Sequence, residues 1–136
     1  MTDDLETAQV AKLDHICRKL RLEPGMKFLD VGCGWGALIM HAAQNYGVDA
    51  VGITLSEAQA THARQNIAAA GLSDRCRVEL RDYRDLDGKP EFDRAASVGM
   101  MEHVREDLQP GYFDAVFRVL KPGGVFMNHA IVSVSR

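Results

Sequence analysis

The sequence contains no long apolar run. No stretch approaches the roughly 20 residues that a helix needs to cross a bilayer. The first residues, Met1-Thr2-Asp3-Asp4, are acidic, and no apolar segment follows them. A secretory signal peptide requires a positively charged start and an apolar centre. The sequence therefore predicts a cytoplasmic protein.

Cysteine is also scarce. The chain has three cysteines, Cys17, Cys33 and Cys76, which lie far apart in the sequence. Their number is odd and none belongs to a CxxC pair, so the pattern predicts neither a disulfide framework nor a zinc site. We expect three reduced thiols and no bound metal.

An excess of positive charge is absent too. The 136 residues carry 16 Lys and Arg against 19 Asp and Glu, which gives a net charge of -3. This balance offers no electrostatic basis for binding nucleic acid. With 46% hydrophobic and 26% charged residues, the composition is that of an ordinary globular protein, and the length fits one domain.

What is present is an alternation of strand and helix patterns. Such alternation predicts βαβ units, and hence an α/β fold with a parallel sheet flanked by helices. We expect one domain over 1–136, made of an N-terminal helix at 1–22 and a core at 27–136. The expected strands are 27–31, 49–53, 77–80, 92–98 and 125–133; the expected helices are 2–22, 36–46, 57–70 and 112–120, with a polar loop at 82–90.

The segment from Phe28 to Ala37 says most about function. Apolar residues lead into Asp30, and glycines follow at positions 32, 34 and 36 before a helical pattern starts. Glycine adopts dihedral angles that a Cβ disfavours and lets the backbone approach a ligand closely. The helix start offers unpaired N–H groups and the positive end of the helix dipole. The turn therefore predicts a site for an anion, either a phosphate or a carboxylate.

Two cofactor classes fit this turn, and a turn without a ligand is a third alternative. Gly32-x-Gly34-x-x-Ala37 satisfies the dinucleotide fingerprint, but a nicotinamide cofactor also needs an acidic residue at the end of the second strand. That strand ends in Thr54-Leu55-Ser56, and Glu57 already belongs to the next helix. A carboxylate at Asp30 would repel a diphosphate, whereas it suits an ammonium group. This favours S-adenosylmethionine, which carries an ammonium and a carboxylate but no phosphate.

Several longer stretches are more specific than the glycine turn. The most specific are Asp82-Tyr83-Arg84-Asp85-Leu86 and Ser97-Val98-Gly99-Met100-Met101-Glu102-His103-Val104. With them the chain resembles the cyclopropane-fatty-acid synthase family, which includes the mycolic acid cyclopropane synthases and adds a methylene from S-adenosylmethionine across a lipid double bond. The other matching stretches are Ala11-Lys12-Leu13-Asp14, Leu29-Asp30-Val31-Gly32-Cys33-Gly34-Trp35-Gly36, Val51-Gly52-Ile53-Thr54-Leu55-Ser56, Phe92-Asp93-Arg94 and Leu120-Lys121-Pro122-Gly123-Gly124.

The resemblance implies a Rossmann-like class I methyltransferase fold with sheet order 3-2-1-4-5, lacking its C-terminal strands. It also implies a cofactor site at the ends of the first three strands. Asp82 and Tyr83 would meet the adenine, although a turn cap and a packed aromatic are the alternatives for these two. The methionine part would lie on Asp30, Gly32, Cys33, Gly34, Trp35 and Gly36, and the ribose along Thr54, Leu55, Ser56 and Gln59.

Closing a cyclopropane ring requires a base, because the methylated alkene must lose a proton. The resemblance implies that a bicarbonate ion is this base, held by Glu102 and His129 with the backbone of Ile131. Each side chain also has a simpler interpretation, a packing histidine for His129 and a cap for Glu102. We read His103 as structural.

The chain departs from the family at both ends. Family members carry an earlier segment resembling Tyr-Ser-Cys-Ala-Tyr, which supplies a cysteine to the ion site, and a later segment that forms most of the lipid pocket. Neither is found in this sequence, and Cys33 belongs to the glycine turn. We therefore expect a truncated chain that binds S-adenosylmethionine weakly and turns over little lipid by itself.

The leading hypothesis is thus a methyltransferase that acts on unsaturated phospholipid acyl chains, with peripheral contact at the inner face of the membrane. The alternatives are a relative that methylates an amine or a lipid without ring closure, and a non-catalytic fragment that binds the cofactor. The first helix, with its apolar stripe, could touch a membrane, but its mixed charges favour ordinary packing. The sequence assigns no oligomeric state.

Overall fold

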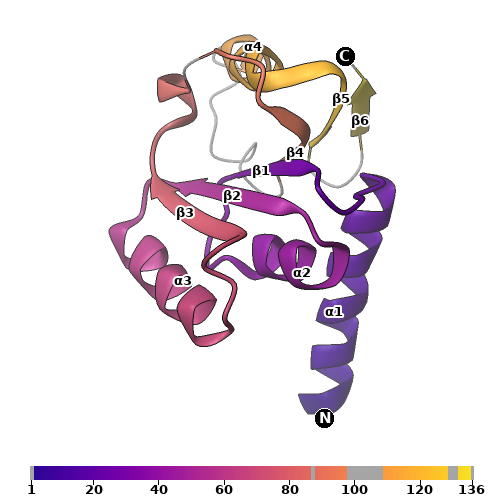
Figure 1. Cartoon of the computed structure of the whole chain (residues 1–136), viewed down its shortest axis with the longest axis vertical. Coiled ribbons are helices and arrows are strands. Elements are labelled where there is room, and N and C mark those ends of the chain that lie inside the picture. The colour runs from indigo at the N-terminus through magenta and orange to yellow at the C-terminus, as the bar shows by residue number, and fades with distance from the viewer. Residues whose placement is uncertain (1, 87, 98–108, 129–131, 136) are drawn as a thin grey trace.

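A computed structural model describes residues 2–86, 88–97, 109–128 and 132–135. Helices and strands alternate along the chain, as the sequence predicts (Figure 1). Most of the observed bounds lie within one to three residues of the predicted ones. The elements are α1 (Thr2–Lys19), β1 (Lys27–Val31), α2 (Ala37–Tyr46), β2 (Asp49–Thr54), α3 (Glu57–Ala69), β3 (Cys76–Leu80), the 3₁₀ helix η1 (Tyr83–Asp85), β4 (Phe92–Ser97), α4 (Gln109–Val119), β5 (Leu120–Asn128) and β6 (Val132–Ser135).

The strands form one sheet in the order β3-β2-β1-β4-β5-β6. The first five in this order are parallel, and β6 is antiparallel to β5. The predicted order 3-2-1-4-5 is confirmed. The chain builds the sheet from β1 outward to β3 and then crosses back, so that β4 pairs on the other side of β1. The carboxyl ends of β1 and β4 therefore form the crevice where doubly wound sheets bind their ligands.

The predicted fifth strand, 125–133, is wrong at both ends. β5 already begins at Leu120, opposite Phe92, and the Pro122-Gly123-Gly124 segment lies within a register irregularity of that strand. β5 ends at Asn128, and Ser133 belongs to β6, where it lies opposite Met127. Val125, Phe126 and Met127 form an apolar run in β5, whereas apolar and polar residues alternate in β6, and neither pattern reveals a change of strand direction.

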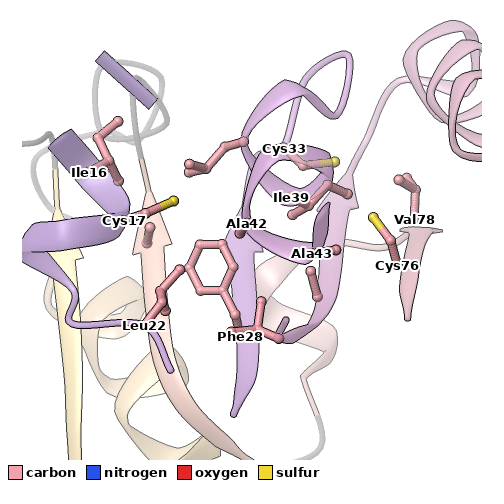
Figure 2. Close-up of a cluster of buried hydrophobic side chains, with 14 of the residues drawn as sticks. Ile16, Cys17, Leu22, Phe28, Cys33, Ile39, Ala42, Ala43, Cys76 and Val78 are labelled. Carbon is pink, nitrogen blue, oxygen red and sulfur yellow. The ribbon is translucent and has the colours of Figure 1, made fainter. Parts of the chain in front are cut away.

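Two apolar clusters cover the two faces of the sheet. The first joins α1, α2 and α3 to one face, and the second joins η1 and α4 to the other (Figure 1). Figure 2 shows the first cluster, in which Phe28 of β1 lies among side chains from α1 and α2. All three cysteines are separate buried thiols of this cluster, and burial raises the pKa of each to about 12. None of the helices in the described ranges has the length and apolar content that crossing a bilayer requires.

A polar network fixes α1 against α2. Nε2 of His41 lies 2.6 Å from Oδ1 of Asp14, and the hydroxyl of Tyr46 donates to the same oxygen at 3.1 Å. The amide of Asn45 lies 3.2 Å from the other ring nitrogen of His41. The hydrogen bond from His41 lowers the pKa of Asp14. The network therefore fixes the position of α1 relative to α2.

Replacing Asp14 by Asn should loosen α1 from the rest of the chain. The carboxylate accepts from both His41 and Tyr46, and an amide oxygen is a weaker acceptor for both donors. Lys12, Arg18 and Lys19 make α1 a target for trypsin. We expect trypsin to cleave within α1 faster in Asp14→Asn than in the original chain. Mass spectrometry of the fragments measures the rate. Asp74→Asn, a change at an exposed carboxylate, is the control; equal cleavage rates in both variants would contradict the anchoring role.

Candidate functional site

The candidate site lies where β1, β2 and β3 end. The residues that follow β1 are attached to β2, because the N–H groups of Gly32 and Cys33 both donate to the carbonyl of Ile53 at 2.9 Å. The loop after β3 is attached in turn, since the N–H of Arg81 donates to Thr54 at 3.0 Å. The three predicted cofactor-binding segments are therefore neighbours at one edge of the sheet.

The turn after β1 depends on its glycines. Gly32, Gly34 and Gly36 have φ angles of 78°, 56° and 90°, all in the left-handed region that disfavours a side chain. Gly36 also lies close to α3, where an added Cβ would approach Cβ of Ala63 to 3.1 Å. The sequence pattern therefore reflects both backbone conformation and tight packing of the turn against a neighbouring helix.

Only some amides of the turn can receive a ligand. Gly32 and Cys33 donate to Ile53, and Gly36 donates to Cys33 at 3.0 Å, so these three are already used. No side chain caps α2. Within the described residues, the N–H groups of Gly34, Trp35 and residues 37–39 have no acceptor. An anion would therefore meet the centre of the turn and the first turn of α2, rather than the whole glycine set.

Asp30 is a buried carboxyl group that has no hydrogen-bond partner in the described ranges of the chain. Asp30 is the second-to-last residue of β1, just before the glycines, and is only 4% exposed. Burial raises its pKa from 3.8 to about 7, and no described residue donates to it. A nearby cation would stabilise the ionised form of such a carboxyl group, because its positive charge offsets the loss of hydration.

Asp30 faces a cavity of about 370 Å³. One wall is the glycine turn with the start of α2, and the opposite wall is α1. The volume lies in the range of small-molecule sites. The lining residues are Gln9, Lys12, Leu13, Ile16, Asp30, Gly32, Cys33, Gly34, Trp35, Ala37 and Leu38.

Cys33 and Trp35 differ in exposure. Cys33 is 7% exposed and lies against Gly52 of β2, in the first apolar cluster (Figure 2). Its raised pKa and its burial make it a packing thiol rather than a nucleophile. Trp35 is 55% exposed and contacts the ring of His62 edge-on, with centroids 5.2 Å apart.

Hydroxyl and amide groups gather after β2. The hydroxyl of Thr54 donates to Oε1 of Gln59 at 3.0 Å, and Oγ of Ser56 accepts the N–H of Gln59 at 3.2 Å as the cap of α3. These bonds leave the amide nitrogen of Gln59 and the hydroxyl hydrogen of Ser56 free to donate to a ligand. Leu55 is 64% exposed beside them. The set offers neutral groups that bind hydroxyls without a carboxylate.

Asp82 and Tyr83 have clear structural roles. Asp82 caps η1, accepting from the N–H of Arg84 at 2.9 Å and from its guanidinium, and this contact lowers the pKa of Asp82. Tyr83 is 8% exposed and packs in the second apolar cluster. The alternatives of a turn cap and a packed aromatic therefore describe what both residues do in the fold, and contact with an adenine stays a prediction.

The predicted catalytic residues Glu102, His129 and Ile131 lie outside the described residues. The residues that line the cavity include several that sequence reasoning did not assign to the site, among them Gln9 and Lys12 of α1. Sequence reasoning also missed Gly52, which lies behind the turn against Cys33. Their signals were present. A glycine inside a strand often marks close approach of another backbone, and Gln9 and Lys12 lie on the helix face of Leu13 and Ile16.

The chain is similar to a known protein family and to several bacterial relatives. The family model described as mycolic acid cyclopropane synthetase matches residues 1–136. The cyclopropane-fatty-acyl-phospholipid synthase of Escherichia coli strain K12 is 47% identical over 131 residues, covering 96% of this chain and 33% of that protein. A probable fatty acid methyltransferase of Pseudomonas putida is 46% identical over 129 residues, covering 95% and 33%. The chain thus spans about a third of the length of these relatives.

Solved structures agree in fold. A crystal structure of the mycolic acid cyclopropane synthase CmaA1, complexed with SAH and CTAB, superposes with a TM-score of 0.84 at 41% identity, over 92% of this chain and 44% of that one. Coclaurine N-methyltransferase bound to N-methylheliamine and SAH superposes with a TM-score of 0.80 at 24% identity, over 88% and 35%. The second likeness concerns the fold alone, which is that of class I methyltransferases.

Proposed function

The chain belongs to the mycolic acid cyclopropane synthetase family, and from this premise we propose that it forms the cofactor-binding part of an S-adenosylmethionine-dependent lipid methyltransferase. The acceptor is the double bond of an unsaturated phospholipid acyl chain. Contact with such an acceptor would bring the protein to a membrane surface from the cytoplasm.

The observation that carries this proposal is the carboxyl of Asp30 in the cavity beside the glycine turn, to which no residue in the described part of the chain donates. A diphosphate would place negative charge against this carboxyl, whereas an amino-acid end would place its ammonium there. The neutral groups of Ser56 and Gln59 supply donors for ribose hydroxyls where a nicotinamide site would have an acidic side chain.

S-adenosylmethionine would supply a methyl group that its sulfonium already activates. The residues of this chain would therefore mainly orient and enclose the cofactor. Asp30 and the free amides of Gly34 and Trp35 fix the amino-acid end, and Ser56 and Gln59 fix the ribose. Alignment of donor and acceptor by such contacts is itself a large part of catalysis when little acid–base help is needed.

We further propose that Glu102, His129 and the backbone of Ile131 hold a bicarbonate ion, which would supply the base for ring closure. A carboxylate next to an anion requires a donor between them, because like charges repel. His129 can provide this donor, since its ring carries an N–H in either neutral tautomer, and the backbone N–H of Ile131 is a second one.

Calorimetric titration of the purified chain with S-adenosylhomocysteine and, separately, with NADH tests the cofactor. We expect binding of S-adenosylhomocysteine and none of NADH. Binding of NADH with exclusion of S-adenosylhomocysteine would overturn the proposal.

Incubation with S-adenosylmethionine and vesicles of unsaturated phospholipid tests the acceptor, with mass spectrometry as the readout. Acyl chains that gain one CH₂ unit and lose alkene reactivity would support cyclopropanation. A CH₂ gain on a headgroup amine, or on an acyl chain that keeps its alkene, would instead identify a related methyltransferase with another acceptor or without ring closure.

A further inference from the structure

One face of α1 forms a wall of the cofactor cavity. Gln9, Lys12, Leu13 and Ile16 follow each other at helical spacing and all line the cavity. Ile16 is 2% exposed and Leu13 half-buried, whereas Gln9 and Lys12 are exposed. The face therefore changes from apolar at its C-terminal half to polar at its N-terminal half, and the polar half faces the turn that follows β1.

Lys12 is a cation without a carboxylate of its own. Asp14, two residues away, is engaged by His41 and Tyr46. Among the residues that the structure describes, none forms an ion pair or hydrogen bond with Lys12. Because Asp14 and not Lys12 anchors α1 to α2, the ammonium of Lys12 is available to a ligand in the cavity, and binding one would not loosen the helix.

Resting on the proposed function, we propose that Lys12 binds the carboxylate of the cofactor's amino-acid end, with Gln9 as a second polar contact. The cavity then matches the whole zwitterion. Asp30, which is only 4% exposed and has no hydrogen-bond partner among the described residues, receives the ammonium. The carboxylate meets Lys12 and the free N–H groups at the start of α2, where the helix dipole also favours negative charge.

The test compares two ligands that differ in this end. S-adenosylhomocysteine carries the amino-acid carboxylate, and 5′-methylthioadenosine lacks it while keeping the nucleoside. We expect Lys12→Gln to weaken S-adenosylhomocysteine about tenfold, as loss of a charge-assisted hydrogen bond does, and to leave 5′-methylthioadenosine unchanged. Lys12→Arg should retain most of the affinity. Lys19→Gln, a change at an exposed lysine of α1 that does not line the cavity, is the matched control and should bind both ligands like the original chain.

Each other outcome overturns the inference in a distinct way. Unchanged S-adenosylhomocysteine binding in Lys12→Gln removes the role of Lys12 and leaves the proposed function standing. Equal weakening of both ligands shows a general distortion of the site. Weaker sedimentation with vesicles of anionic phospholipid, at unchanged affinity for S-adenosylhomocysteine, would assign the lysine to a membrane surface. If the original chain binds neither ligand, the proposed function fails together with the inference.

Discussion

Asp30→Asn is expected to stabilise the fold while destroying the site. The asparagine side chain has nearly the same shape but never ionises, so the folded chain no longer holds a buried group that resists ionisation. The same change removes the charge that we propose meets the cofactor's ammonium. We expect affinity for S-adenosylhomocysteine to fall by at least about tenfold.

The pH dependence of this gain follows from the pKa. The pKa of Asp30 is about 7 in the folded chain, against 3.8 ordinarily. Between these values the unfolded chain ionises while the folded one stays protonated, so the original chain loses stability as the pH rises through this window and loses no more above it. The free energy of unfolding of Asp30→Asn should therefore exceed that of the original chain by about 2–4 kcal/mol at pH 8. The difference should be smaller at pH 5 and absent below about pH 4.

Urea denaturation at several pH values measures the gain, and Asp49→Asn, at an exposed position, is the control that should show none. In the original chain, affinity for S-adenosylhomocysteine should also increase as the pH rises through 7, because Asp30 must ionise to pair with an ammonium. A variant that is less stable at pH 8, or that binds like the original chain, would show that Asp30 is a structural carboxyl.

The order of the sheet and the place of the site could be predicted because they follow from patterns local in sequence. Alternating strand and helix periods lead to a parallel sheet, and a strand followed by Gly32, Gly34 and Gly36 leads to a turn at its carboxyl end. The capping role of Ser56 could be predicted for the same reason, since the contact with Gln59 spans three residues.

Contacts between distant segments could not be predicted. Which amides of the turn stay free depends on Ile53, a residue of another strand, and the sequence pattern does not show that Gly32 and Cys33 donate to it. The reversal from β5 to β6 was missed because side-chain alternation is the same in either direction. The wall that α1 contributes depends on how Asp14 meets His41, 27 positions along the chain.

The contact between Gly52 and Cys33 yields the last large effect, and Gly52→Ala is expected to disrupt the glycine turn from beneath. A Cβ at this position would lie 2.6 Å from Cβ and 2.7 Å from Sγ of Cys33, with Ile39 at 3.0 Å. Neither side can yield easily, because Cys33 is held to Ile53 through its own N–H. We expect a loss of about 1–3 kcal/mol in the free energy of unfolding, together with loss of S-adenosylhomocysteine binding.

Double variants locate the clash. Cys33→Ala keeps the Cβ at 2.6 Å and should not relieve Gly52→Ala, whereas Cys33→Gly removes both close atoms and should recover part of the stability. Gly111→Ala, in α4 with no atom within 4 Å of an added Cβ, is the control and should be neutral or slightly stabilising. Equal rescue by Cys33→Ala would mean that the sulfur, and not the backbone of the turn, limits the space above β2. The turn would then be free to adjust, and the glycine in β2 would matter for packing alone.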